Sequence, residues 1–90
     1  MDIVEYLENR AAKLEKRFWE YLEADKNTYA NKIDRELRQV EIWINEIKDL
    51  RKHTDLRNEL IIYKMVLADY PEMSADAEER IQEYRKEGRI

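Results

Sequence analysis

Two stretches of the chain repeat apolar residues at alternating steps of three and four positions. Residues three and four apart lie on one face of a helix, so each stretch predicts a long amphipathic helix with a single buried seam. The first seam consists of Val4, Leu7, Ala11, Leu14, Phe18 and Tyr21, and the second of Ala30, Ile33, Leu37, Val40, Ile44 and Ile47.

Two shorter helices are expected after these. The segment from Leu60 to Ala68 is apolar except for Lys64, which favours a helix buried nearly all round. We expect helices at about 2–24, 28–52, 55–70 and 74–87. Short loops between such helices favour antiparallel neighbours. The sequence therefore predicts one all-α domain, residues 1–90: an antiparallel bundle of three main helices and a shorter fourth, which dimerisation could complete.

The helix ends carry recognisable stop and start signals. Asp25 and Thr28 would fall on the buried seam of a continuous helix, so we expect a turn at 25–28. A single bent helix through this segment is the alternative. The expected N-terminal caps are Asp2, then Asn27 or Thr28, then Thr54 or Asp55, and finally Ser74, while Pro71 and Gly88 should end the last two helices.

Composition narrows the class of protein. One glycine and one proline in 90 residues agree with helix throughout, and the absence of cysteine excludes disulfides and thiolate metal sites. No apolar run approaches the roughly 18 residues that a membrane span needs. The N-terminal segment is acidic and lacks the basic start of a signal peptide, so we expect a cytoplasmic protein with no membrane partner.

Several apolar residues are left over once each helix has one buried seam. They are Ala12, Trp19 and Leu22 in the first helix, Ile42 in the second, and Ile61, Ile62 and Met65 in the third. A core with a broad apolar face could absorb most of them. Alternatively, they form an interface with a second copy of the chain or with a protein target, because aromatic and aliphatic patches ringed by charge are typical of such surfaces.

Charge suggests a second type of partner. The chain has a net charge of −4, which disfavours non-specific nucleic-acid binding, but residues 26–58 carry eight bases and six acids. The start of the second helix could hold a phosphate on its free amides, with a tyrosine to stack on a base. This candidate anion or nucleotide site comprises Lys26, Asn27, Thr28, Tyr29, Lys32, Arg35 and Arg38.

One carboxylate pattern has catalytic precedent. Glu20 and Glu23 are followed, after 22 residues, by Glu46 and Asp49. This spacing resembles that of the all-helical nucleoside triphosphate pyrophosphohydrolases, and the resemblance implies carboxylates on two facing helices that hold magnesium against a nucleotide's phosphates. The seams, however, place these four residues on the solvent side of their helices, where an ordinary acidic surface is expected.

No other chemistry stands out. His53 is the only histidine, and one imidazole supplies too few nitrogen ligands for a zinc site. Ser74 is explained by its expected role as a helix cap. We therefore expect a non-enzymatic interaction module without a cofactor. Its size and acidity are those of an accessory regulator or inhibitor, such as phages and mobile elements carry. Its partners would be itself, as a homodimer or larger oligomer, or a protein target.

Overall fold

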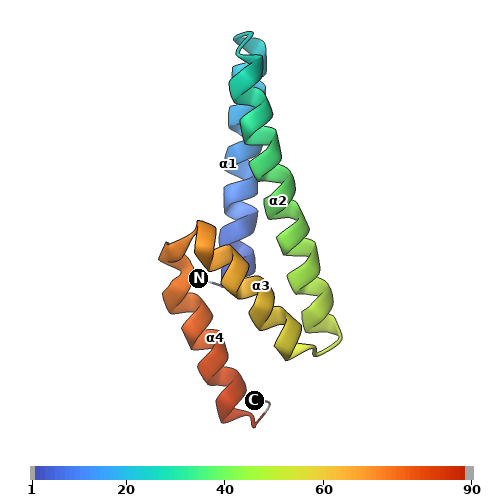
Figure 1. The fold of residues 1–90 in the computed structure, drawn as a ribbon, viewed down its shortest axis with the longest axis vertical. Coiled ribbons are helices and arrows are strands. Elements are labelled where there is room, and N and C mark those ends of the chain that lie inside the picture. The colour runs from blue at the N-terminus through green and yellow to red at the C-terminus, as the bar shows by residue number, and fades with distance from the viewer. Residues whose placement is uncertain (1, 89–90) are drawn as a thin grey trace.

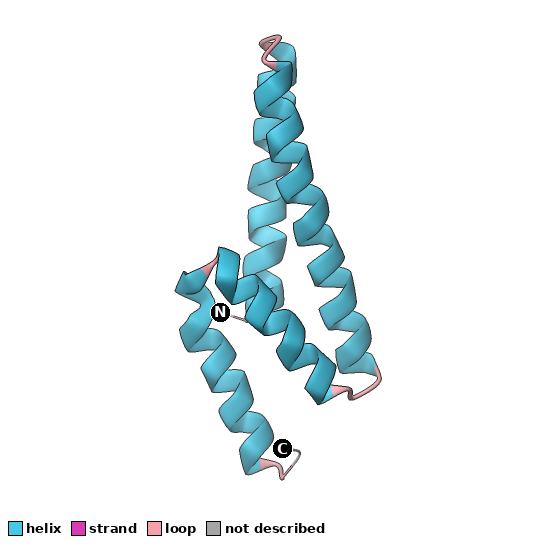
Figure 2. Ribbon diagram, viewed as in Figure 1, coloured by secondary structure: helices cyan, strands magenta, loops and turns pink. Residues whose placement is uncertain are grey.

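The chain is all-helical in a computed structural model that describes residues 2–88 (Figure 1, Figure 2). Within that range there are no strands, and the prediction of an all-α protein is confirmed. The elements are α1 (Ile3–Glu23), α2 (Asn27–Lys52), α3 (Leu56–Asp69), the short 3-10 turn η1 (Pro71–Met73) and α4 (Ser74–Lys86).

The two long helices form a hairpin along the longest dimension of the molecule, which measures 53 Å (Figure 1). We call the end at the turn between α1 and α2 the tip, and the opposite end the base. Figure 1 shows α3 crossing the base, after which η1 reverses the chain and α4 leads away from the tip. With 14 residues, α3 is only one residue longer than α4, so the described part of the chain has two long and two short helices. The tip is left with two helices only.

The core lies at the base, where α3 packs on the hairpin. Leu7, Val40, Ile47, Tyr63 and Val66 are at most 1% exposed there. Toward the tip, Leu14 and Ala30 remain buried, but the other seam residues Phe18, Tyr21 and Ile33 are only half-buried. Apolar burial therefore decreases from the base to the tip, because a third layer of side chains is missing at the tip.

Two of the predicted caps are confirmed. A carboxylate oxygen of Asp2 accepts a hydrogen bond from the Val4 amide at 3.3 Å, and Asp55 accepts one from the Asn58 amide at 3.2 Å. Gly88 follows α4 with a φ of +73°, the left-handed conformation that glycine adopts without strain.

The other two predicted caps are wrong. Asn27 is already the first residue of α2, and neither it nor Thr28 caps the helix; the cap position belongs to Lys26, which makes no side-chain bond to the helix. The turn is tighter than expected because Asp25 takes a φ of +59°. Ser74 has helical angles itself, since η1 leads directly into α4.

The expectation that the third helix is buried nearly all round is also wrong. Only one side of α3, which includes Tyr63 and Val66, packs on the hairpin. Its outer side is uncovered, and Ile61 and Met65 are exposed there. In Figure 1 the helix crosses the base between α2 and α4, and neither of them covers its outer side.

Over the described part of the chain, none of the helices is both long and apolar enough to cross a membrane.

Candidate functional site

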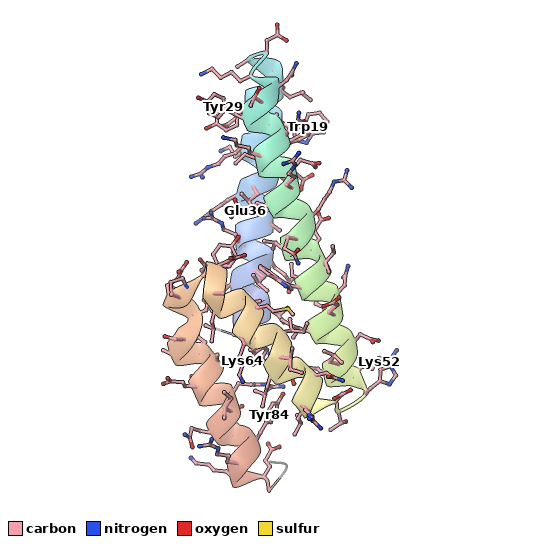
Figure 3. The ribbon with its side chains drawn as sticks, viewed as in Figure 1. Trp19, Tyr29, Glu36, Lys52, Lys64 and Tyr84 are labelled. Carbon is pink, nitrogen blue, oxygen red and sulfur yellow. The ribbon has the colours of Figure 1, made fainter. Side chains whose placement is uncertain are left out.

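The tip of the hairpin carries the largest exposed aromatic side chains. Trp19 is 54% exposed and Tyr29 is 56% exposed, although both come from helices whose seams are apolar. Figure 3 shows these two side chains on opposite sides of the tip. The tip therefore has two distinct faces, one on each side of the plane that contains α1 and α2.

The first face continues the surface that α3 and η1 cover at the base. At the base, this surface includes Tyr6 and Arg10 of α1 and Glu36 and Trp43 of α2, and Tyr70 at the end of α3 contacts all four. Helical steps of three and four continue the same sides of both helices toward the tip. The residues reached are Lys13, Arg17, Tyr21, Tyr29 and Lys32, which we call the cation–tyrosine face.

The covered part of this surface shows how it accepts a helix. The Tyr70 hydroxyl donates to Oε1 of Glu36 at 2.6 Å, and Arg10 donates to the same oxygen at 3.0 Å while lying 5.4 Å from the centre of the Tyr70 ring. Burial alone would raise the pKa of Glu36, but these hydrogen bonds outweigh it, and the pKa is lowered. Aromatic rings and carboxylate–cation pairs thus hold α3 in place.

The uncovered part of this surface, near the tip, carries the same kinds of side chain, but α3 does not pack on them. The rings of Tyr21 and Tyr29 lie 5.6 Å apart and tilted by 30°. Lys13, Arg17 and Lys32 are exposed, and no carboxylate within the described residues forms a salt bridge with any of them.

The second face lies on the other side of the hairpin. Glu8 and Lys48 form a 3.7 Å salt bridge across it near the base. Steps of seven residues from these two positions reach Glu15 and Leu22 in α1 and Asp34 in α2, all on the same side. Together with Ala12 and Trp19, these residues form what we call the tryptophan–acid face. The Trp19 ring is held edge-on against Phe18, with centroids 5.3 Å apart.

The predicted anion site is only partly assembled. Tyr29 and Lys32 share the cation–tyrosine face, and Lys26 lies beside them in the turn, preceding Asn27 and Thr28. Arg38, in contrast, donates to Asp34 at 2.9 Å. Helical spacing places Arg35 and Arg38 toward the back of α2, so the structure does not gather all the predicted cations at one place.

The four predicted interface positions in α3 and on the back of α2 lie in three different settings. Ile61 and Met65 are exposed on the outer side of α3, where a shallow apolar groove of about 510 Å³ is lined by Arg57, Leu60, Ile61 and Lys64. Ile62 instead packs against the core. Ile42 is 49% exposed on the back of α2, where its helical neighbours are polar or charged.

A buried polar cluster at the base was not predicted. Glu59 of α3 is fully buried, and its carboxylate accepts hydrogen bonds from Arg51 at 2.6 Å, Tyr63 at 2.7 Å and Tyr84 at 2.5 Å. Arg51 also donates two 2.8 Å bonds to Asp2, and these lower the pKa of Asp2. One side-chain cluster therefore joins all four helices.

Sequence spacing contained a signal for this cluster. Arg51 follows Ile44 and Ile47 at steps of three and four, so it occupies a seam position of α2. Glu59 likewise lies between Leu56 and Tyr63 in the seam of α3. An arginine and a glutamate on facing seams indicate a buried ion pair, whereas hydrophobicity alone favours the neighbouring Leu60 over Glu59 as the buried residue.

The carboxylates of the pyrophosphohydrolase-like pattern do not come together. The contact between Glu8 and Lys48 shows that Glu46 and Asp49 lie beside the start of α1. Glu20 lies twelve residues further along α1, which corresponds to roughly 18 Å. Across residues 2–88, no group of three or more histidine, cysteine or acidic side chains is arranged to hold a metal ion.

Beside the buried cluster, a cleft of about 360 Å³ separates α4 from the start of α1. Both acids and arginines line it: Asp2, Arg51, Asp76, Glu79, Arg80 and Glu83. The two arginines already face carboxylates, since Arg51 is bound to Asp2 and Glu59, and Arg80 lies 3.8 Å from Glu59. The lining therefore has four carboxylates against two arginines, and this excess of negative charge disfavours an anion.

Comparison with known proteins finds no matching family model, no matching curated protein and no matching solved structure.

Proposed function

We propose that this protein is a non-enzymatic interaction module that acts by binding another protein chain, as an oligomeric accessory regulator or inhibitor. The observation that carries the proposal is the uncovered tip, where Trp19, Leu22 and Tyr29 are exposed at the end of the hairpin that the short helices do not reach. Tryptophan and tyrosine are the residues that most often dominate binding energy at protein interfaces.

The arrangement of the tip supports binding rather than stability. Burying one large apolar side chain contributes roughly 1.5–3 kcal/mol, which is a large share of the 5–15 kcal/mol typical of a whole domain. The fold forgoes this contribution at Trp19 and Tyr29. A partner that covers the tip recovers it, and the half-buried Phe18, Tyr21 and Ile33 beneath complete their burial at the same time.

A capture experiment tests the proposal. The immobilised wild-type chain should retain a protein partner, itself included, whereas W19A/L22A should lose it and keep full helicity by circular dichroism. The double variant I61A/M65A tests whether the outer side of α3 contributes to capture, and I42A tests the same for the back of α2. Equal capture by the wild type and every variant, or no capture at all, would contradict the proposal.

A second candidate function is nucleotide or nucleic-acid binding. The tilted pair of Tyr21 and Tyr29, with Lys26 and Lys32 nearby in the sequence, provides both stacking surfaces and positive charge. In that case nucleotides or a single-stranded oligonucleotide at low salt should raise the melting temperature of the wild type, and K26A and Y29A should abolish the shift. An unchanged melting temperature would exclude this function.

A further inference from the structure

The two faces of the tip differ in charge as well as in position. We propose that they bind each other between separate molecules: the cation–tyrosine face of one copy packs on the tryptophan–acid face of a second copy. This inference rests on the proposed function and deepens it by naming the partner.

The cation–tyrosine face lacks the acidic partner that the same surface has at the base. There, Arg10 pairs with Glu36 and lies against the Tyr70 ring of α3. One and two steps further along α1, Lys13 and Arg17 have no salt-bridge partner within the described chain. A complementary surface therefore has to bring carboxylates together with an aromatic or aliphatic side chain.

The tryptophan–acid face offers that combination. Glu15 is exposed and makes no salt bridge within the described chain, and it lies one helical step from Trp19. Asp34 of α2 adds a second carboxylate, which is partly exposed although Arg38 contacts it. Trp19 and Leu22 supply the apolar surface. The tryptophan–acid face thus offers the carboxylates and apolar side chains that would complement the cation–tyrosine face.

Charge also decides which faces can meet. Two copies joined through the same face would place Lys13, Arg17 and Lys32 against their own equivalents, or Glu15 and Asp34 against theirs. Like charges across an interface are strongly disfavoured. Pairing unlike faces avoids both arrangements, so the contact is heterologous rather than two-fold symmetric.

The short helices restrict how the second copy approaches. Because α3 and η1 cover this side of the hairpin at the base, only the cation–tyrosine face at the tip is open (Figure 1). A second hairpin packed in the same direction at a normal helix separation of about 8–10 Å would overlap α3. The second copy must therefore point the opposite way or cross the tip. Its contact with α1 then extends from Lys13 to Tyr21, which is roughly 12 Å of helix.

A heterologous contact leaves one unused face at each end of the assembly. The assembly can grow beyond a dimer unless it closes into a ring. We therefore expect the average mass of the wild type to increase with protein concentration and to decrease with salt, because the contact depends on exposed charges.

Two charge-reversal variants test the contact by sedimentation velocity. R17E/K32E disables the cation–tyrosine face, and E15K/D34K disables the tryptophan–acid face. Each variant alone should associate about tenfold or more weakly than the wild type. An equal mixture should associate again, since the intact face of each variant matches that of the other. The control K16E/K86E changes the net charge by the same amount as R17E/K32E, at exposed positions outside both faces, and should behave as the wild type.

Three results would overturn the inference. One is a wild type that stays monomeric at all concentrations. The capture experiment with W19A/L22A then decides separately whether the proposed function holds. Another is a closed dimer that forms in both reversal variants alone, because the contact would then lie elsewhere. The third is a single-stranded oligonucleotide that binds the wild type through Arg17 and Lys32, because a nucleic acid would then occupy the cation–tyrosine face.

Discussion

Glu59 is the residue on which the base of the molecule depends most. Its carboxylate is fully buried and accepts hydrogen bonds from Arg51, Tyr63 and Tyr84, which come from three different helices. A buried charge is costly unless it is paired and fully hydrogen-bonded. These contacts meet that requirement, and they fix the positions of α2, α3 and α4 relative to one another.

Replacing this carboxylate by an amide should destabilise the fold. In E59Q the side chain keeps its shape, but Arg51 loses one of its two anionic partners and the tyrosines lose a charged acceptor. We expect a loss of about 2–3 kcal/mol in the free energy of unfolding, measured by urea denaturation. E83Q, at an exposed acid of α4, serves as the control and should change it by less than about 0.5 kcal/mol. Equal effects of the two substitutions would contradict this role of Glu59.

The same residues show what the sequence could and could not predict. Apolar spacing predicted both long helices, the turn after residue 24 and the uncovered Trp19, because burial of one helical face dominates those segments. It failed at Glu59 and Arg51, since a hydrophobic pattern treats charged seam residues as solvent-exposed. It failed again for the outer side of α3, because which side a short apolar helix buries depends on its neighbours and not on its own composition.

At the scale of elements, α4 is the least firmly attached helix. It contacts the rest of the molecule through Ala77 and Tyr84, which are buried, and through Arg80, whose Nε lies 3.8 Å from Oε1 of Glu59 in α3. The Tyr84 hydroxyl bonds to Glu59, so removing its proton would place two negative charges side by side. Burial, together with this hydrogen bond, raises the pKa of Tyr84 to about 12.

Alkaline pH should therefore release α4. Because the folded state raises the pKa of Tyr84, its contribution to stability is complete below about pH 10 and is lost as the pH rises toward about 12. Circular dichroism should show helix loss in that range together with tyrosinate absorbance. Y84F should lose this component, and Y29F, at an exposed ring, should retain it. An identical alkaline transition in Y84F would contradict the assignment.

The hairpin tip gives a second prediction at this scale. Leu14 is 1% exposed within the two-helix segment, whereas Trp19 is largely exposed. L14A should lower the free energy of unfolding by about 2–4 kcal/mol through loss of buried surface and a new cavity. W19A should change it by less than about 0.5 kcal/mol at concentrations where the chain is monomeric. A large loss in W19A would show that Trp19 stabilises the isolated fold rather than an interface.

At the scale of the whole molecule, the two ends of the hairpin differ. The base has a third layer of helix and a polar cluster that joins α1, α2, α3 and α4, while the tip has two helices, exposed aromatic rings and opposite charges on its two sides. A molecule built this way is stable at one end and available for contact at the other. We assign stability to the base and propose association at the tip.

Fluorine NMR of the chain labelled with fluorotryptophan tests this division most directly. The two tryptophans report on the two ends, because Trp19 is exposed at the tip and Trp43 is 6% exposed in the core of the base. As protein concentration rises, we expect the Trp19 resonance to shift and broaden while that of Trp43 stays in place. A Trp19 resonance that remains unchanged while sedimentation shows association would contradict the account, because the contact would then lie away from the tip.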